Sequence, residues 1–307
     1  MVKKKLIVSY SILIIVIALL VIIPFTGMNS LVPIIYEAFM WIALVQSFNI
    51  ISGYTGYVSF GHVAFYGTAA TVTAILVGFG IPIFLSIPVG GIGAAILAAG
   101  IGFPTLKLRG AYFAIAMLSI SEAMAVLILY LYPYGITLPP GLYDPTTTYY
   151  LMFALAVTAF IVTYSIARSK FGLALMSIRE DEDAAAATGV NVFRFKIIAF
   201  MIAALLAGLA GGIAVWRATY TEAAGAFGVE KTIEMIAMCM FGGAGTVTGP
   251  VFGAIVLYAL EYILWSRLPF LHLIIFGVII VATVLFIPKG VIGVIRERFP
   301  KLRKILR

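Results

Sequence analysis

The sequence predicts an all-α, polytopic integral membrane protein with about ten transmembrane helices. Of the 307 residues, 63% are apolar and only 10% are charged, whereas an average soluble domain has about 25% charged residues. The apolar residues gather in runs close to the ~20 residues that a helix needs to cross a bilayer. The basic residues fall mostly on one side of these runs. This pattern excludes a soluble globular protein, a disordered chain and a nucleic-acid binder.

The apolar runs define the expected spans in chain order. The first run has 18 residues and no small-residue cleavage site after it, so we expect an uncleaved span rather than a signal peptide. The eighth run is short and Gly249-Pro250 interrupts the ninth. Eight spans are therefore the alternative, with 232–265 forming one broken helix and a re-entrant turn. The ten runs lie at 6–23, 34–52, 60–79, 82–103, 111–132, 149–167, 196–216, 232–243, 247–265 and 269–287.

The distribution of Lys and Arg predicts the orientation. If the N-terminus is cytoplasmic, the cytoplasmic segments hold 17 of the 20 basic residues, and the outside segments hold Arg217, Lys231 and Arg267. Short cytoplasmic loops carry such an excess, so both termini are expected in the cytoplasm. Residues 1–307 then form a single transmembrane domain with a cytoplasmic loop at 168–195. Its basic tail at 288–307 is expected to lie on anionic lipid headgroups.

Signatures of catalysis and cofactor binding are absent from the sequence. It has no Walker loop and no dinucleotide-binding fingerprint. Its two histidines and single cysteine lack metal-ligand spacing. We therefore expect no metal, no bound cofactor and no enzymatic activity. Glu122 and Glu261 lie well inside expected spans, where a carboxylate is either functional or hydrogen-bonded to a neighbouring helix.

Two glycine-rich segments interrupt the apolar pattern. Irregular backbone at membrane depth either lines a cavity or packs within protein, so each segment is either part of a solute path or a tight turn between packed helices. They share the pattern G-x-x-G-x-V-[ST], and both fall on the cytoplasmic side of the ten-span scheme. The first comprises Gly53, Gly56, Ser59, Gly61 and His62, with Gln46 and Asn49 before it, and the second comprises Gly242, Gly243, Gly245 and Thr248.

The loop 168–195 contains the pattern of a short surface helix. Ser177 is a candidate N-cap, and acidic residues follow it in the first turn, where the helix dipole favours them. Four alanines propagate the helix, and Gly189 is a natural C-terminal stop. The flat alanine side could fit a groove on another protein.

Three stretches resemble the permease subunits of ATP-binding-cassette importers for branched-chain amino acids. They are Gly53 to Gly67, Leu108 to Glu122, and Gly172 to Gly212 followed by Phe241 to Gly253. Leu108 to Phe113 is more similar to the M-type of the two permease types. Asp183-Ala184-Ala185-x-x-x-Gly189 resembles the family's E-A-A-x-x-x-G coupling loop, with Asp in place of Glu. The outside loop 133–148 departs from the family because it lacks a threonine-glycine-glycine stretch.

The resemblance implies half of an alternating-access path for leucine, isoleucine or valine across the cytoplasmic membrane. A second permease subunit, identical or different, would supply the other half. Two cytoplasmic ATPase subunits would bind the ATP, and an extracytoplasmic solute-binding protein would deliver the solute. The path would include Gln46, Asn49, Glu122 and the two glycine-rich segments. Arg179, Asp183, Ala184, Ala185 and Gly189 would contact the ATPase.

Three alternatives remain open at this stage. A permease of the same superfamily could carry urea, an amide, a sugar or a nucleoside. An independent secondary carrier or channel would need no ATPase. A structural membrane scaffold would transport nothing.

Overall fold

The computed structural model describes residues 20–26, 30–268, 270–271, 274–275, 277–278, 281 and 290–293. These residues are mostly helical, as the composition predicts. The predicted first span at 6–23, the last span at 269–287, the basic tail at 288–307 and both termini lie wholly or largely outside the described residues.

Six of the predicted spans are confirmed as apolar helices of membrane length. Among the described residues, six segments are long and apolar enough to cross a membrane, and a seventh helix, α3, is apolar but has only 16 residues. The chain is therefore a multi-pass membrane protein. The seven are α2 (Leu31–Phe48, continued by the π-helical η2, Asn49–Gly53), α3 (Val63–Gly78), α4 (Ile83–Thr105), α5 (Ala111–Leu131), α6 (Pro145–Arg168), α9 (Val192–Ala218) and α12 (Thr248–Arg267).

The predicted span at 232–243 falls on a helix that is too short to cross a bilayer. Helix α11 (Val229–Gly242) has 14 residues, which rise about 21 Å in an α-helix, less than the ~30 Å of a bilayer core. The chain turns after Gly243, and α11 and α12 contact each other. The described part of the chain does not confirm ten spans. The region 232–265 forms two helices joined by a turn, of which only α12 has membrane length.

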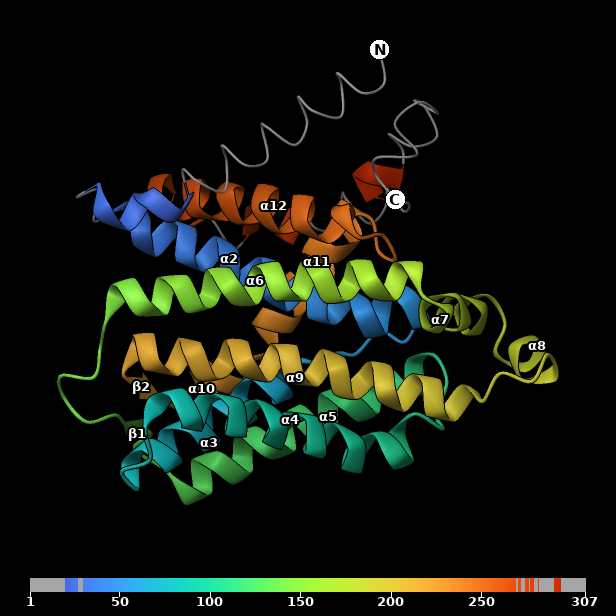
Figure 1. The fold of residues 1–307 in the computed structure, drawn as a ribbon, viewed down its shortest axis with the longest axis horizontal. Coiled ribbons are helices and arrows are strands. Elements are labelled where there is room, and N and C mark those ends of the chain that lie inside the picture. Colours follow the sequence, from blue (N-terminus) through green and yellow to red (C-terminus); the bar gives the residue numbers. More distant parts are fainter. Residues whose placement is uncertain are drawn as a thin grey trace, which may run out of the picture.

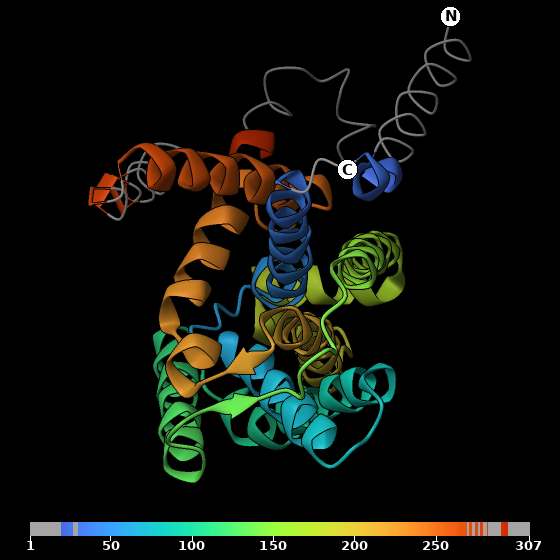
Figure 2. The same cartoon turned by 90° about the vertical axis from the view of Figure 1, so that its left-hand side faces the viewer.

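Helix α9 lies at the centre of the bundle. It packs against α3, α4, α2 and α6, while α2 also contacts α6 and α12. Figure 2 shows α3 to α5 on one side, α12 on the other, and α2 and α9 between them. Glycines permit the close approach: a Cβ at Gly211 of α9 would lie 2.1 Å from the Tyr66 carbonyl oxygen of α3. Small residues at helix interfaces are typical of membrane bundles.

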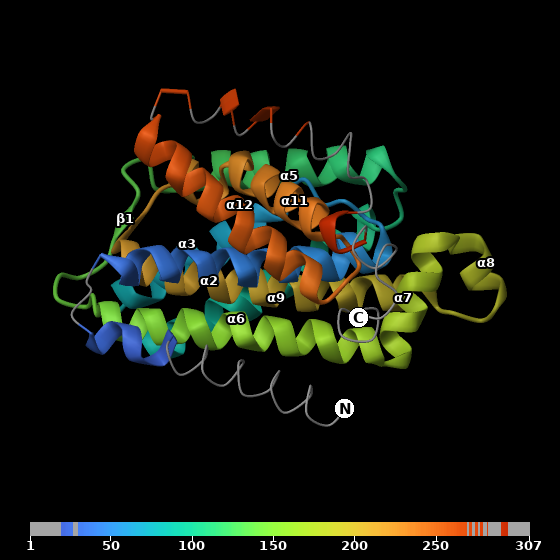
Figure 3. The same ribbon diagram turned by 90° about the horizontal axis from the view of Figure 1, so that it is seen from above.

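The bundle has two distinct ends (Figures 1 and 3). At one end, β1 (Ile136–Thr137) pairs antiparallel with β2 (Tyr220–Thr221), beside α10 (Ala223–Phe227). At the other end, α7 (Lys170–Glu180) and α8 (Glu182–Ala187) project from the bundle. We refer to these as the β1–β2 end and the α7–α8 end.

The loop 168–195 forms two helices, so the single helix expected from Ser177 to Gly189 is wrong. Ser177 lies inside α7, where its hydroxyl donates to the Ala174 carbonyl. The helix breaks at Asp181, whose carboxylate accepts from the amides of Asp183 and Ala184, both at 2.9 Å. Aspartate is among the best N-cap residues, so Asp181 rather than Ser177 begins the short helix.

Candidate functional site

The two glycine-rich segments meet at the α7–α8 end of the bundle. The Asn49 amide group bridges them: its Nδ2 donates to the Thr246 carbonyl at 2.9 Å, and its Oδ1 accepts from the Gly245 amide at 2.8 Å. One turn earlier on α2, Gln46 Nε2 donates to the Val247 carbonyl at 2.7 Å. Gln46 and Asn49 are both fully buried. The two polar residues expected in the first segment therefore hold the second segment in place.

Arg179, which lies outside the membrane-spanning helices, forms hydrogen bonds with both glycine-rich segments. Its Nη1 donates to the Gly53 carbonyl at 2.5 Å and to the Ala244 carbonyl at 3.5 Å. Sequence analysis assigned Arg179 to contact with an ATPase subunit. The structure places it on α7, one helix before α8, with its guanidinium on the two glycine turns, and its contact with an ATPase subunit stays a prediction. Arg179 therefore connects the projecting helices to the ends of α2 and α11.

The shared G-x-x-G pattern corresponds to shared backbone geometry. Gly56 and Gly245, its second glycines, both have left-handed dihedrals, with φ of +77° and +80°. Its first glycines both sit at close approaches: a Cβ at Gly53 would lie 1.9 Å from Asn49 Oδ1, and one at Gly242 would lie 1.9 Å from the Gly249 carbonyl oxygen. Only glycine fits such positions without strain or displacement.

The remaining residues of the first segment are packed in the bundle. His62 is fully buried, its Nε2 lies 3.0 Å from Ser47 Oγ, and its ring meets Phe48 edge-on. Gly61 lies against α5, where a Cβ would come within 1.9 Å of the Met117 carbonyl oxygen. These contacts suit a packed turn, and the role of the segment in a solute path stays a prediction.

The other predicted path residues are placed differently from one another. Among the described residues, the hydroxyls of Ser59 and Thr248, which occupy equivalent positions in the two patterns, are buried without a hydrogen-bond partner. Glu122 lies on the exposed face of α5 and does not join the glycine segments. Gly243 ends α11 with φ of +120°.

A buried lysine attaches α8 to the bundle. Lys196, on the first turns of α9, is only 2% exposed. Its ammonium group donates to Glu182 Oε1 at 2.8 Å, to the Tyr57 hydroxyl at 3.0 Å and to the Leu106 carbonyl at 2.7 Å. Tyr57 in turn donates to Glu182 Oε2 at 2.6 Å. All three donors of the ammonium are thus satisfied, as a buried charge requires. We call Tyr57, Glu182 and Lys196 the α8 anchor.

Arg109 adds a second, exposed link to α8. Its guanidinium forms a bidentate pair with Asp183, at 2.9 and 2.7 Å, and lies 3.7 Å from Glu182. Burial alone would raise the pKa of Glu182, but hydrogen bonds from Lys196 and Tyr57 outweigh it, so the pKa is lowered. The hydrogen bonds and charge of Arg109 also lower the pKa of Asp183. Both carboxylates are therefore ionised near neutral pH.

Sequence analysis missed the α8 anchor. It counted Lys196 only as a cytoplasmic charge, and it gave Tyr57 and Glu182 no role of their own. A signal was present, because Lys196 begins a run of apolar residues that the chain buries at the centre of the bundle. A buried lysine needs a carboxylate partner, and 168–195 is the nearest acidic loop.

The outer face of α8 carries three of the four alanines. Ala184, Ala186 and Ala187 are exposed, whereas Ala185 is 3% exposed and packs against this chain. Gly189 has φ of +89°, and the amides of Gly189 and Val190 close the helix on the Ala186 and Ala185 carbonyls. The glycine stop is confirmed as a Schellman-type end.

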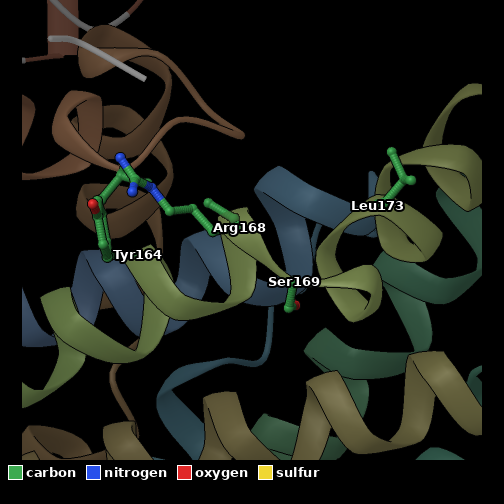
Figure 4. A pocket seen from close by; sticks show the side chains of 6 residues that line it. Tyr164, Arg168, Ser169 and Leu173 are labelled. Carbon is green, nitrogen blue, oxygen red and sulfur yellow. The ribbon is translucent and has the colours of Figure 1, made fainter. Parts of the chain in front are cut away.

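A cavity of about 510 Å³ lies beside the second glycine segment. Tyr164 and Arg168 of α6, Leu173 of α7 and Val247 line it. In Figure 4 the Arg168 side chain turns toward Tyr164, and its guanidinium carbon lies 4.4 Å from the centre of that ring. Leu173 lies apart from them on α7. The α7–α8 end therefore combines a charged depression, the two glycine turns and an anchored surface helix.

Comparison with known proteins gives this arrangement a context. A family model described as "Branched-chain amino acid transport system / permease component" matches residues 30–284, which include all helices from α2 to α12. The "High-affinity branched-chain amino acid transport system permease protein LivM" of Escherichia coli (strain K12) is 28% identical over 270 residues, covering 76% of this chain and 63% of that protein. This chain thus spans less than two thirds of that relative's length.

Other relatives are shorter or more distant matches. The "Probable branched-chain amino acid transport permease protein LivM" of Methanocaldococcus jannaschii is 27% identical over 246 residues, covering 67% of this chain and 70% of that protein. The "L-arabinose transport system permease protein AraH" of Escherichia coli is 31% identical over 127 residues, covering 39% of this chain and 38% of that protein. No solved structure matches the chain.

Proposed function

The chain belongs to the branched-chain amino acid transport system permease family, and from this premise we propose that it is the membrane-spanning permease subunit of an ATP-driven importer for leucine, isoleucine and valine. The family match carries the proposal, because it covers every membrane-length helix of the described chain. The cell's cytoplasmic membrane is the proposed location. The chain contributes a path and couples it to ATP hydrolysis on other subunits.

The α7–α8 end is the proposed docking surface for the ATPase subunits. The exposed alanines of α8 offer a flat face, and Arg109 and Lys196 hold that helix against the bundle. A force applied to α8 therefore reaches α9 directly. In this scheme ATP-driven closure moves α8 and rocks the helices around the path in an alternating-access cycle. This end, together with both termini, faces the cytoplasm.

Helix α5 supports a second permease subunit as partner. Only 11% of its most apolar stretch is buried within this chain, and Glu122 is exposed midway along the helix. A carboxylate facing lipid at that depth is costly, so we propose that α5 packs against the second permease. The solute-binding protein would approach the β1–β2 end. The basic tail at 288–307 would contact lipid headgroups.

The proposed path includes the two glycine turns with Gln46, Asn49 and Ser59. Their backbone groups at the α7–α8 end would meet the solute on its way to the cytoplasm. The number of spans around this path, eight or ten, is part of the same proposal. Cysteine labelling of every loop would count the spans.

Reconstitution tests the proposed function. The chain, its partner permease and ATPase subunits are assembled in liposomes, with the solute-binding protein and radiolabelled leucine outside and ATP inside. We expect leucine uptake that requires ATP and every subunit. Uptake by this chain alone would identify a secondary carrier and contradict the proposal.

A sugar is the second candidate solute, because the arabinose permease matches 39% of this chain. The same liposomes distinguish the two classes. Excess valine should abolish leucine uptake, whereas excess arabinose should leave it unchanged. Arabinose uptake without leucine uptake would favour the sugar assignment.

A further inference from the structure

A charged cavity of about 520 Å³ lies near the β1–β2 end, between α2, α3, α9 and α11. Small-molecule sites usually occupy ~300–1,000 Å³. Its wall combines three aromatic residues with three ionic ones: Tyr36, Tyr66, Tyr143, Glu37, Arg217 and Lys231. It lies at the opposite end of the bundle from the glycine turns. We call it the outer cavity.

The ionic groups of the outer cavity include both signs of charge. Arg217 Nη1 donates to Glu37 Oε1 at 2.5 Å, and the guanidinium carbon lies 4.1 Å from the centre of the Tyr36 ring. The ammonium of Lys231 donates to the Gly225 carbonyl at 2.6 Å. Among the described residues, Lys231 forms no ion pair. Two cations and one carboxylate leave the wall with a net positive charge.

Two adjoining cavities extend the outer cavity. One of about 300 Å³ shares Tyr36, Tyr143 and Arg217 with it. Another of about 210 Å³ shares Tyr66 and also borders Ala214. Arg217 therefore lies at a junction of cavities, with aromatic rings on its flanks. This arrangement provides a fixed charged point next to apolar space.

We propose that the outer cavity binds the zwitterion of an aliphatic amino acid. The solute carboxylate binds Arg217 and Lys231, and its ammonium group binds Glu37 beside the aromatic rings. A cation over an aromatic face is itself favourable. The aliphatic side chain lies against Met40 and the tyrosine rings of the cavity wall, where apolar area leaves water. The charges select the amino acid backbone and the rings select an apolar side chain.

This inference rests on the proposed function, since it names the site where the transported solute first binds. It places that site at the β1–β2 end rather than at the glycine turns. Arg217 and Glu37 pair with each other in the cavity wall. Solute binding exchanges part of this pair for contacts with the two charged ends of the solute.

The first test uses the unaltered permease–ATPase complex in nanodiscs, without the solute-binding protein. Binding of radiolabelled leucine is measured in competition with leucinamide, which lacks the carboxylate, and with 4-methylpentanoate, which lacks the ammonium group. Loss of a charge-assisted hydrogen bond is worth about tenfold or more in affinity. Each analogue should therefore compete at least about tenfold more weakly than unlabelled leucine. Equal competition by either analogue would overturn the proposal.

Variants locate the site. Arg217→Gln and Glu37→Gln should each weaken leucine binding by about tenfold. Arg267→Gln is the matched control, because Arg267 is an exposed arginine at the end of α12 that does not line the cavity. Binding by Arg217→Gln equal to that by the control would overturn the proposal.

A charge swap separates binding from packing. The double variant Glu37→Arg with Arg217→Glu keeps an ion pair but reverses its polarity. We expect assembly near that of the unaltered complex and weak leucine binding. Full recovery of binding would show that the pair is only structural. ATP-driven leucine uptake by the unaltered complex and by Arg217→Gln is measured in parallel. Equal uptake by the two refutes the cavity alone, whereas no uptake by the unaltered complex refutes the proposed function.

Discussion

The α8 anchor should carry a large part of the stability of the α7–α8 end, and Lys196→Met tests this. Methionine keeps the length and apolar stem of the side chain but removes its ammonium group. The change leaves the Leu106 carbonyl without the donor it has in the structure and removes the cation that faces Glu182. It therefore removes one side of a buried charge pair.

The contacts of Lys196 determine how much stability Lys196→Met should lose. Removing one member of a buried ion pair costs about 3–5 kcal/mol. Glu182 is 20% exposed at its side chain, so water can compensate part of its charge, and we expect a loss at the low end of that range, about 3 kcal/mol. Tyr57→Phe removes one hydroxyl that donates to Glu182 and accepts from Lys196. For this variant we expect about 1–2 kcal/mol.

Two measurements on the purified complex check the ranking. The unfolding temperature, followed by intrinsic fluorescence, should be highest for the unaltered complex, lower for Tyr57→Phe and lowest for Lys196→Met. Limited proteolysis should cut near α8 faster in Lys196→Met, because that helix loses its attachment to α9. In liposomes the same variant should hydrolyse ATP with reduced leucine uptake per ATP.

If Lys196→Met unfolds at the same temperature as Tyr57→Phe and α8 is no more accessible to protease, the ammonium group contributes no more than one hydroxyl. The buried pair would then not hold α8. Arg194→Met is the matched control, because it removes a cation from an exposed site on the same first turns of α9. It should leave both the unfolding temperature and the proteolysis of α8 nearly unchanged.

Three further predictions concern a glycine turn, the orientation in the membrane and the charge of Glu182. Gly245→Ala should destabilise the complex more than Gly80→Ala, because both have positive φ but only Gly245 has neighbours within 3 Å of an added Cβ; equal thermal shifts would contradict this. In a cysteine-free background, Pro140→Cys and Ala186→Cys should label from opposite sides of sealed vesicles, and labelling from one side would overturn the orientation. The pKa of Glu182 is lower in the folded protein than its unfolded value of about 4.3. The stabilisation that results is complete when the pH is above the unfolded pKa, and it is lost as the pH falls through the folded pKa. The unfolding temperature of Glu182→Gln should therefore fall less on acidification than that of the unaltered complex.

The sequence was sufficient to predict most of the membrane helices. Six runs match α2, α4 to α6, α9 and α12 because burial in lipid or in the bundle demands an apolar helix of membrane length, and a seventh run matches the shorter α3. The run at 232–243 was already short in the sequence, and the helix that forms there, α11, has only 14 residues. Hydropathy indicates that a run of residues is buried in lipid or protein, but it does not indicate where the backbone turns. Here the turn is at Gly243, which has a positive φ.

The sites depended on tertiary contacts that no local pattern contains. The glycine turns were found by composition, but the bridge from Asn49 to Gly245 joins residues 196 positions apart. In the outer cavity, Glu37 and Arg217 are 180 positions apart. The sequence showed Arg217 and Lys231 only as two of three outside basic residues. Their convergence on one cavity follows from the packing of α2, α9 and α11.

Helices α2 and α9 connect the two ends of the molecule. Helix α2 carries Glu37 at the outer cavity and Asn49 just beyond its other end, and α9 carries Arg217 at the cavity and Lys196 at the α8 anchor. Lys196 and Arg217 lie near opposite ends of one continuous helix, separated by a rise of about 32 Å. An α-helix resists stretching because its hydrogen bonds run along its axis. A displacement of α8 that reaches Lys196 therefore moves Arg217 relative to Glu37 unless α2 moves with it, and the packing of α2 against α9 decides which of the two occurs.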